Sequence, residues 1–191
     1  MSGETASSVC VFCSSSNEID PQFHEVAAEL GTALGNCRCE LIFGGTDVGT
    51  MGSLARAHQA AGGHVTSVVP HVFIDRGIAY TPSDTLLQTR DLRERKEVMI
   101  ARSDAIVVLP GGTGTLDELF DVLATTMLGL LEKPIVMMNT AGFFDTLLRF
   151  LDELHTKGFL TKPAHEYLVV VSSTKDVLRA LNLDDLTNST D

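Results

Sequence analysis

A short glycine-rich segment of this sequence has the composition of a phosphate-binding loop. It follows Ala105–Leu109, a run rich in β-branched residues, and precedes a stretch with the apolar spacing of a helix. Glycine lets the backbone approach a ligand closely, and the first turn of a helix offers unpaired N–H groups and the positive end of a dipole. Threonines add hydroxyl donors. The pattern therefore predicts phosphate binding, rather than a tight turn without a ligand, by Gly111, Gly112, Thr113, Gly114 and Thr115.

Acidic residues crowd the start of the helix predicted after this loop. Asp117 and Asp121 are ordinary partners for the positive end of a helix dipole. The register sets Glu118 apart, because it lies beside the mouth of the loop while the core side of the helix is formed by Leu116, Leu119, Phe120 and Leu123. A carboxylate next to a bound phosphosugar can activate water or stabilise an oxocarbenium-like sugar. Glu118 is therefore the candidate catalytic carboxylate.

A second cluster of charge, Arg90–Glu97, precedes the glycine loop and has the capping pattern of a helix start at Asp91 and Glu94. Its spacing predicts an inward-facing stripe formed by Leu92, Arg95, Lys96 and Met99. A cation on such a stripe needs an anionic partner in a protein that is acidic overall. Arg95 can pair with Glu118 or hold a phosphate or a ribose. The alternative is a solvated helix face with ion pairs four residues apart.

Strand-like and helix-like segments alternate along the chain, which predicts an α/β fold: a Rossmann-like, doubly wound, mostly parallel sheet with helices on both faces. In the common strand order 3-2-1-4-5, the strand at Val9–Cys13 lies beside Ala105–Leu109. The loops that follow these two strands then face each other across a crevice. Ser14 and Ser15 are therefore expected opposite the glycine loop.

Other segments are less informative. A second glycine loop, Phe43–Gly52, offers Gly44 and Gly45 for close approach to a ligand, although a structural turn explains it equally well. A helix is expected from about Gly52, and a long helix is expected to run from the first glycine loop to about Leu130. The pattern of residues 71–90 is the least clear and predicts only a loop and a short strand at 85–89.

The 191 residues suit a single domain, 1–191, ordered over about residues 8–182 and ending in a polar tail. The formal net charge of −11 disfavours binding to nucleic acid, so an anionic ligand must be bound by a local group of residues that offsets this repulsion. Neither a membrane span nor a leader segment is recognised, and the cytoplasm is the expected compartment.

Cys10 and Cys13 would point to opposite faces of a strand, which favours buried thiols over a zinc site built with Cys37 and Cys39. We expect no metal.

Several motifs resemble those of one known family. Pro110–Glu118 matches the pattern P-G-G-x-G-T-x-x-E of the cytokinin-activating Lonely guy (LOG) proteins, which were often formerly labelled possible lysine decarboxylases. The R-K pair of their preceding helix is present as Arg95-Lys96, and Cys10–Ser16 is similar to their first strand and loop. Phe43-Gly44-Gly45 is similar to the start of their second glycine loop. The resemblance covers almost the whole chain, residues 9–182.

The resemblance implies a Rossmann-like homodimer that acts as a phosphoribohydrolase without a metal or an organic cofactor. Its substrate would be a small-molecule nucleoside monophosphate, a cytokinin riboside 5′-monophosphate with AMP as a related substrate. Its products would be the free base and ribose 5-phosphate. Glu118 and Arg95 would be the catalytic pair, and the glycine loop would bind the 5′-phosphate. Further candidate substrate- or phosphate-binding positions are Lys96, Met99, Asp117, Ser14, Ser15, Gly44 and Gly45.

The sequence departs from the family pattern at positions that concern the base more than the phosphate. Leu92-Arg93 replaces a Met-His pair, and Ala124–Met127 replaces Thr-Trp-Ala-Gln. The base preference is therefore expected to differ or to be looser. A non-catalytic carrier of a nucleotide or of the molybdenum cofactor is the alternative on the same fold. A lysine decarboxylase has little support, because no lysine has the setting of a Schiff base.

Overall fold

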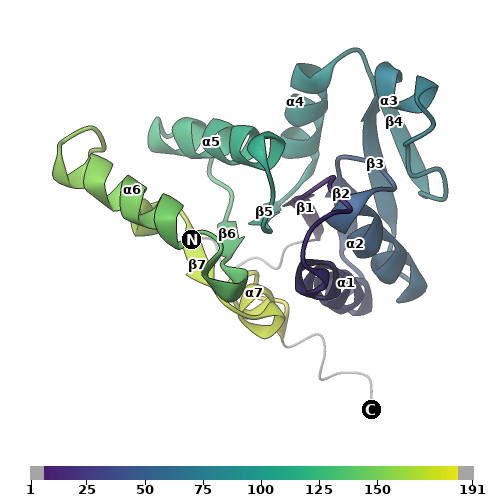
Figure 1. Ribbon diagram of the computed structural model, residues 1–191, viewed down its shortest axis with the longest axis horizontal. Coiled ribbons are helices and arrows are strands. Elements are labelled where there is room, and N and C mark those ends of the chain that lie inside the picture. Colours follow the sequence, from purple (N-terminus) through teal and green to yellow (C-terminus); the bar gives the residue numbers. More distant parts are fainter. Residues whose placement is uncertain (1–6, 185–191) are drawn as a thin grey trace.

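The computed structural model describes residues 7–184, in which strands and helices alternate (Figure 1). The strands are β1 (Ser8–Phe12), β2 (Glu40–Phe43), β3 (Val65–Pro70), β4 (Thr85–Thr89), β5 (Ala105–Val108), β6 (Ile135–Met138) and β7 (Val169–Val171). The helices are α1 (Pro21–Asn36), α2 (Gly49–Ala60), α3 (His71–Asp75), α4 (Leu92–Arg102), α5 (Thr113–Met127), α6 (Asp145–Thr156) and α7 (Thr174–Ala180), with short 3-10 turns η1 (Thr140–Gly142) and η2 (Ala164–Glu166). This order confirms the expected α/β class.

The strands form one parallel sheet in the order β4-β3-β2-β1-β5-β6-β7. At its centre, Val9 of β1 pairs with Leu41 of β2 on one side and with Ala105 of β5 on the other. The chain builds one half of the sheet outward from β1 and then returns to build the other half from β5. The carboxyl ends of β1 and β5 therefore form the switch point at which such sheets bind ligands, as expected.

Helices cover both faces of the sheet, with α4 and α5 above it and α1, α2 and α7 below it in the view of Figure 1. Alternate residues of β1 pack into two separate apolar clusters, because successive strand side chains point to opposite faces. Val11 and Cys13 belong to one cluster, and Cys10 and Phe12 belong to the other. All four cysteines are buried. This placement confirms that Cys10 and Cys13 do not converge.

The start of α4 follows the predicted capping chemistry with one adjustment. The Asp91 carboxylate accepts the N–H groups of Arg93 and Glu94, each at 2.9 Å. The Glu94 carboxylate accepts the Arg90 N–H at 2.7 Å, one residue before the cap that a capping box would use. The cap fixes the end of α4 that lies at the switch point.

Several helix expectations were wrong in detail. Helix α2 begins at Gly49 rather than at Gly52, and residues 71–75 form α3, which the sequence did not predict. Helix α5 ends at Met127 instead of Leu130, because Gly129 takes a left-handed φ of 69° that terminates it. Phe120, expected on the core side of α5, is 40% exposed.

The packed part of the chain continues past residue 182. Leu183 is fully buried, and its carbonyl accepts a hydrogen bond from Cys37 Sγ at 3.7 Å. The predicted polar tail therefore begins later than expected, and its residues 185–191 lie outside the described residues. Over residues 7–184, the structure contains no helix that is both long enough and apolar enough to cross a bilayer.

Candidate active site

A cavity of about 490 Å³ opens at the carboxyl ends of β1 and β5. Its volume falls in the range of about 300–1,000 Å³ typical of small-molecule sites. The loop after β1, the start of α2, the α3 region, the start of α4 and the first turns of α5 supply its walls. The lining residues are Cys13, Ser14, Ser15, Ser16, Thr46, Val48, Met51, Phe73, Ile78, Leu92, Arg95, Gly112, Thr113, Gly114, Thr115 and Glu118.

The amino end of α5 is open towards this cavity. Its N-cap residue is Gly112, and no side chain caps the helix. The first bond within the helix runs from the Leu116 N–H to the Gly112 carbonyl at 3.0 Å. Because the first-turn N–H groups of a helix have no intrahelical acceptor, those of Thr113, Gly114 and Thr115 remain for an anion.

The glycines of this loop divide into two kinds. A Cβ added at Gly111 would lie 2.1 Å from Thr115 Oγ1, so Gly111 is needed for packing. A Cβ at Gly112 or Gly114 would meet no heavy atom within 4 Å. No neighbour within the described chain explains glycine at these two positions, and their bare backbone leaves space for a ligand.

Two predicted phosphate ligands have structural hydrogen bonds instead. Thr115 Oγ1 donates to the Cys13 carbonyl at 3.0 Å, so this hydroxyl joins the end of β1 to α5. Ser14 is buried: its N–H donates to Thr50 Oγ1 at 2.9 Å, and its hydroxyl oxygen accepts the Ser16 N–H at 3.1 Å. Thr113 and Ser15 are exposed on the cavity wall. Their hydroxyls are the better candidates for ligand contact.

The predicted pairing of Arg95 with Glu118 is confirmed. Arg95 Nη1 lies 3.5 Å from Glu118 Oε1, and the two residues are only 7% and 5% exposed. Burial raises the pKa of Glu118 to about 7, although the neighbouring Arg95 guanidinium lowers it. A carboxyl group with such a pKa can exchange a proton near neutral pH, which is what acid–base catalysis requires.

Backbone carbonyls hold Arg95 in place. Its Nη2 donates to the Gly44 carbonyl at 2.9 Å, and its Nε donates to the Val68 carbonyl at 3.3 Å. A Cβ at Gly44 would lie 1.5 Å from Nη2, so only glycine admits the arginine there. Gly45 has a left-handed φ of 68° and accepts the Tyr80 N–H at 2.8 Å. The two glycines support Arg95 and the α3 region and are not among the lining residues.

Lys96, Asp117 and Met99 lie outside the lining as well. Lys96 Nζ is 2.9 Å from Asp117 Oδ2 and 3.4 Å from Asp121 Oδ2, so these charges join α4 to α5 beside the Arg95–Glu118 pair. Met99 is fully buried in the core. Lys96 and Asp117 therefore hold α4 against α5, and Met99 packs in the core, rather than lining the cavity.

Sequence reasoning missed the apolar part of the cavity. Phe73 and Ile78 line the cavity and come from residues 71–90, where the sequence shows no clear pattern. A signal that could have predicted α3 is Pro70, which directly precedes this helix as its N-cap residue. Leu92 was expected to face the core, but it is 53% exposed and lines the cavity.

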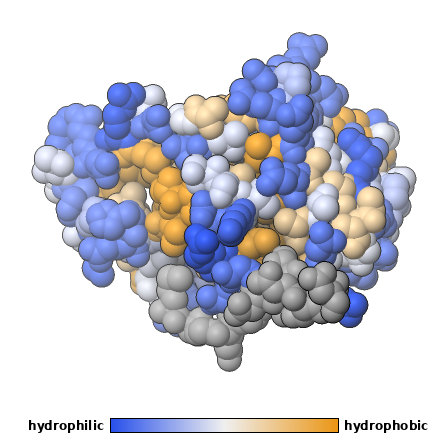
Figure 2. Space-filling model, turned by 90° about the horizontal axis from the view of Figure 1, so that it is seen from below, coloured by the Kyte–Doolittle hydropathy of each residue, from blue (hydrophilic) through white to orange (hydrophobic). Residues whose placement is uncertain are grey.

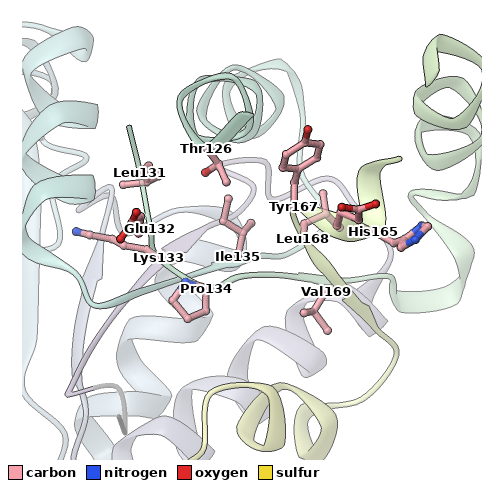
Figure 3. Close-up of a pocket in the computed structure, with 11 residues that line it drawn as sticks. Thr126, Leu131, Glu132, Lys133, Pro134, Ile135, His165, Tyr167, Leu168 and Val169 are labelled. Atoms are coloured by element: carbon pink, nitrogen blue, oxygen red, sulfur yellow. The ribbon is translucent and has the colours of Figure 1, made fainter. Parts of the chain in front are cut away.

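A second cavity, of about 420 Å³, lies near the amino end of β6 and is shown in Figure 3. It contains none of the predicted site residues, and several of its polar groups already have partners. Lys133 Nζ donates to the Ala101 carbonyl at 3.3 Å, and Glu166 pairs with Lys162 at 3.1 Å. The cavity at the switch point is therefore the candidate active site.

Solved structures share this fold. The molybdenum cofactor carrier protein of Chlamydomonas reinhardtii aligns with a TM-score of 0.68 and 19% identity, over 95% of this chain and 98% of that one. The molybdenum cofactor binding protein of Rippkaea orientalis aligns with a TM-score of 0.70 and 18% identity, over 92% of this chain and 95% of that one. At such identities the likeness shows the fold alone.

Sequence relatives are more similar. A Mycobacterium tuberculosis protein named cytokinin riboside 5′-monophosphate phosphoribohydrolase is 43% identical over 172 residues, which are 90% of this chain and 91% of the relative. An Arabidopsis thaliana protein with the same activity in its name is 35% identical over 173 residues, or 91% of this chain and 80% of the relative. The family described as "Possible lysine decarboxylase" matches residues 51–181. The chain therefore belongs to this family, the Lonely guy family that its motifs resemble.

Proposed function

We propose that this protein is a phosphoribohydrolase that cleaves the N-glycosidic bond of cytokinin riboside 5′-monophosphate, and of AMP, giving the free purine base and ribose 5-phosphate. One observation carries the proposal: a buried acid–arginine pair, Glu118 and Arg95, opens on the same cavity as the uncapped start of α5. The relatives named for this activity, at 43% and 35% identity, support it.

In this proposal the start of α5 binds the 5′-phosphate through the backbone N–H groups of Thr113, Gly114 and Thr115. Glu118 lies one turn further along the same helix, so a phosphate held there brings the ribose towards the carboxylate. Lys96 forms an ion pair with Asp117 and so links α4 to α5 next to the Arg95–Glu118 pair.

The reaction follows from these positions. The oxygen of a water molecule bonds to the anomeric carbon of the ribose while the bond from that carbon to the base nitrogen breaks. The electron pair of the broken bond stays with the base. The Glu118 carboxylate stabilises the positive charge on the sugar, accepts the proton of the water and passes it to the leaving base. Arg95 keeps the carboxylate oriented.

The test is to incubate the purified protein with AMP and with isopentenyladenosine monophosphate and to measure free base by chromatography. Glu118→Gln is expected to lower base release by about 10²-fold or more. Glu97→Gln, an exposed change on α4, is the matched control and should leave the rate unchanged. Undiminished release by Glu118→Gln would overturn the proposal.

No specific observation favours the carrier alternative. The molybdenum cofactor carrier and binding proteins are only 19% and 18% identical to this chain, so their likeness shows the fold and not the function. A carrier needs a binding loop but has no need of a buried acid–arginine pair. Tight nucleotide binding without any release of base would nevertheless favour it. A decarboxylase is not supported either, because the cavity lining includes no lysine.

We also propose that the protein is a cytoplasmic homodimer. Large apolar side chains lie exposed near the ends of α5 and α6: Leu128 is 74%, Leu130 73% and Phe159 76% exposed. Figure 2 shows hydrophobic residues gathered at the left of the view, the end at which Figure 1 places α6. Such surfaces are typical of interfaces. Sedimentation should give twice the chain mass of 20.5 kDa, and a monomer at every concentration would contradict the dimer.

A further inference from the structure

The peptide group between Cys13 and Ser14, at the end of β1, is held by two threonines from different helices. Thr115 of α5 donates its hydroxyl to the Cys13 carbonyl at 3.0 Å. Thr50 of α2 accepts the Ser14 N–H at 2.9 Å. Both threonines are buried, and their helices cover opposite faces of the sheet (Figure 1). Because the carbonyl and the N–H of a trans peptide point in opposite directions, this one peptide group links the start of α2 to the start of α5.

Thr50 directs its hydroxyl at both backbone groups of Ser14. Its oxygen accepts the Ser14 N–H, and its proton is donated to the Ser14 carbonyl at 3.1 Å, a contact that spans 36 residues of sequence. The Met51 N–H donates to the same carbonyl at 3.3 Å. Thr50 is not among the residues that line the cavity. It therefore acts on the site through the loop that it holds, and not by contact with a ligand.

The first residue of α2 fits closely against the same loop. The Gly49 N–H donates to Asn17 Oδ1 at 2.7 Å, so the loop supplies a cap that the side chain of the N-cap residue Val48 does not. Gly49 has a left-handed φ of 62°, and a Cβ there would lie 2.5 Å from the Ser14 carbonyl oxygen. The loop after β1 and the start of α2 are thus packed as one unit, to which Thr50 contributes a buried side-chain contact.

Beyond this junction, the loop presents exposed serines to the cavity. The Ser14 hydroxyl oxygen accepts the Ser16 N–H at 3.1 Å, the contact of a serine-stabilised turn. Ser15 and Ser16 are exposed and line the cavity, as does Thr113 in the first turn of α5. An anion bound at the start of α5 therefore has this loop as a neighbour within the same cavity.

We propose that Thr50 is a positioning residue for the 5′-phosphate: it fixes the loop after β1 so that the Ser15 hydroxyl donates to a phosphate bound at the start of α5. Without the Thr50 hydroxyl, the buried Ser14 N–H loses its acceptor, and the loop must move for this group to find another. The Ser15 hydroxyl then leaves the phosphate. This assignment rests on the proposed function, from which it takes the place of the phosphate.

The test compares Thr50→Val, which removes the hydroxyl but keeps the shape of the side chain, with Thr50→Ser, which keeps the hydroxyl. With AMP, Thr50→Val should raise KM about tenfold or more, the effect of losing one hydrogen bond to a charged group, and leave kcat and its pH profile unchanged. Thr50→Ser should keep KM close to the wild-type value. Thr66→Val is the matched control and should leave KM unchanged. Thr66 is also a buried threonine, but its hydroxyl donates to Glu40 Oε1 at 2.5 Å, outside the lining.

A double substitution separates positioning from a general loss of stability. Ser15→Ala, an exposed change, should raise KM as much as Thr50→Val does, and adding Thr50→Val to it should raise KM no further. Full additivity of the two effects, an unchanged KM in either single variant, or a fall in kcat at unchanged KM would overturn the assignment. Because Ser15→Ala does not change the core, it keeps the assignment testable even where Thr50→Val does not fold.

Failure of the wild type to release base would instead overturn the proposed function. Thr50 would then be tested by calorimetric titration with AMP and with adenosine. Thr50→Val must weaken the binding of AMP about tenfold and leave that of adenosine unchanged, because only AMP carries the phosphate. Equal effects on both ligands, or no effect on either, would overturn the assignment.

Discussion

Arg95 is fixed by backbone carbonyls more closely than by its acid. Its hydrogen bonds to Gly44 at 2.9 Å and Val68 at 3.3 Å are both shorter than its 3.5 Å separation from Glu118. The guanidinium therefore keeps its position whether Glu118 is ionised or protonated. A carboxyl group in such a site can gain and lose a proton during turnover while the geometry around it stays constant.

The protonation state of Glu118 should control the rate near neutral pH. Its pKa, raised by burial to about 7, means that the carboxylate required by the proposed reaction is lost as the pH falls below 7. We expect kcat to fall by about tenfold per pH unit on the acid side and to level off above the pKa. The measurement should use kcat at saturating nucleotide, because the phosphate of the free nucleotide itself titrates near pH 6. A kcat that rises towards acid pH would contradict the base role.

Gly44→Ala should remove activity by displacing Arg95. The added Cβ would lie 1.5 Å from Arg95 Nη2, so the guanidinium must leave the position in which it pairs with Glu118. A displacement of about 1 Å at a catalytic group can cost about 10²-fold in rate, and we expect a loss of that size in kcat. Gly114→Ala gives the contrast: its Cβ meets only open space where the phosphate would bind, so it should raise KM instead. Equal effects of both substitutions on KM would contradict these separate roles.

At the scale of the elements, the sequence was informative where hydrophobic periodicity dominates. The central strands β1 and β5 follow from their buried apolar runs, and their adjacency follows from the common strand order of doubly wound sheets. Leu92 shows the limit of that reasoning, because the first turn of α4 extends beyond the core and its stripe there faces the cavity. The partner of Thr115, the Cys13 carbonyl, lies 102 residues away in sequence, and local patterns do not encode such contacts.

The contact between α1 and α2 predicts acid sensitivity of the fold. His58 is fully buried there, with Nδ1 3.2 Å from the Gly31 carbonyl, and burial lowers its pKa below the usual 6.5. The unfolded chain therefore binds the proton better, so His58 costs stability as the pH falls below about 6.5. His58→Asn should flatten the decline of the melting temperature between neutral and mildly acidic pH. Parallel curves for variant and wild type would contradict this.

At the scale of the whole molecule, the acidic surface opposes the ligand that the site is proposed to bind. The net charge of −11 repels a nucleoside monophosphate at long range. The start of α5 attracts it only at contact, because the favourable field of the first-turn N–H groups extends no further than about one helical turn. Association and retention are thus governed by forces of different range.

This difference in range predicts an inverse salt effect. Raising the ionic strength from about 0.01 M to about 0.15 M shortens the Debye length from about 30 Å to about 8 Å and screens the repulsion, while contact hydrogen bonds persist. We expect kcat/KM for AMP to rise modestly over this interval, by about two- to threefold, and kcat to stay constant. Potassium glutamate is the suitable salt, because its bulky anion competes poorly for the phosphate site. A kcat/KM that falls with salt would mean that nearby exposed cations such as Arg93 attract the substrate from a distance, against the net charge of the chain.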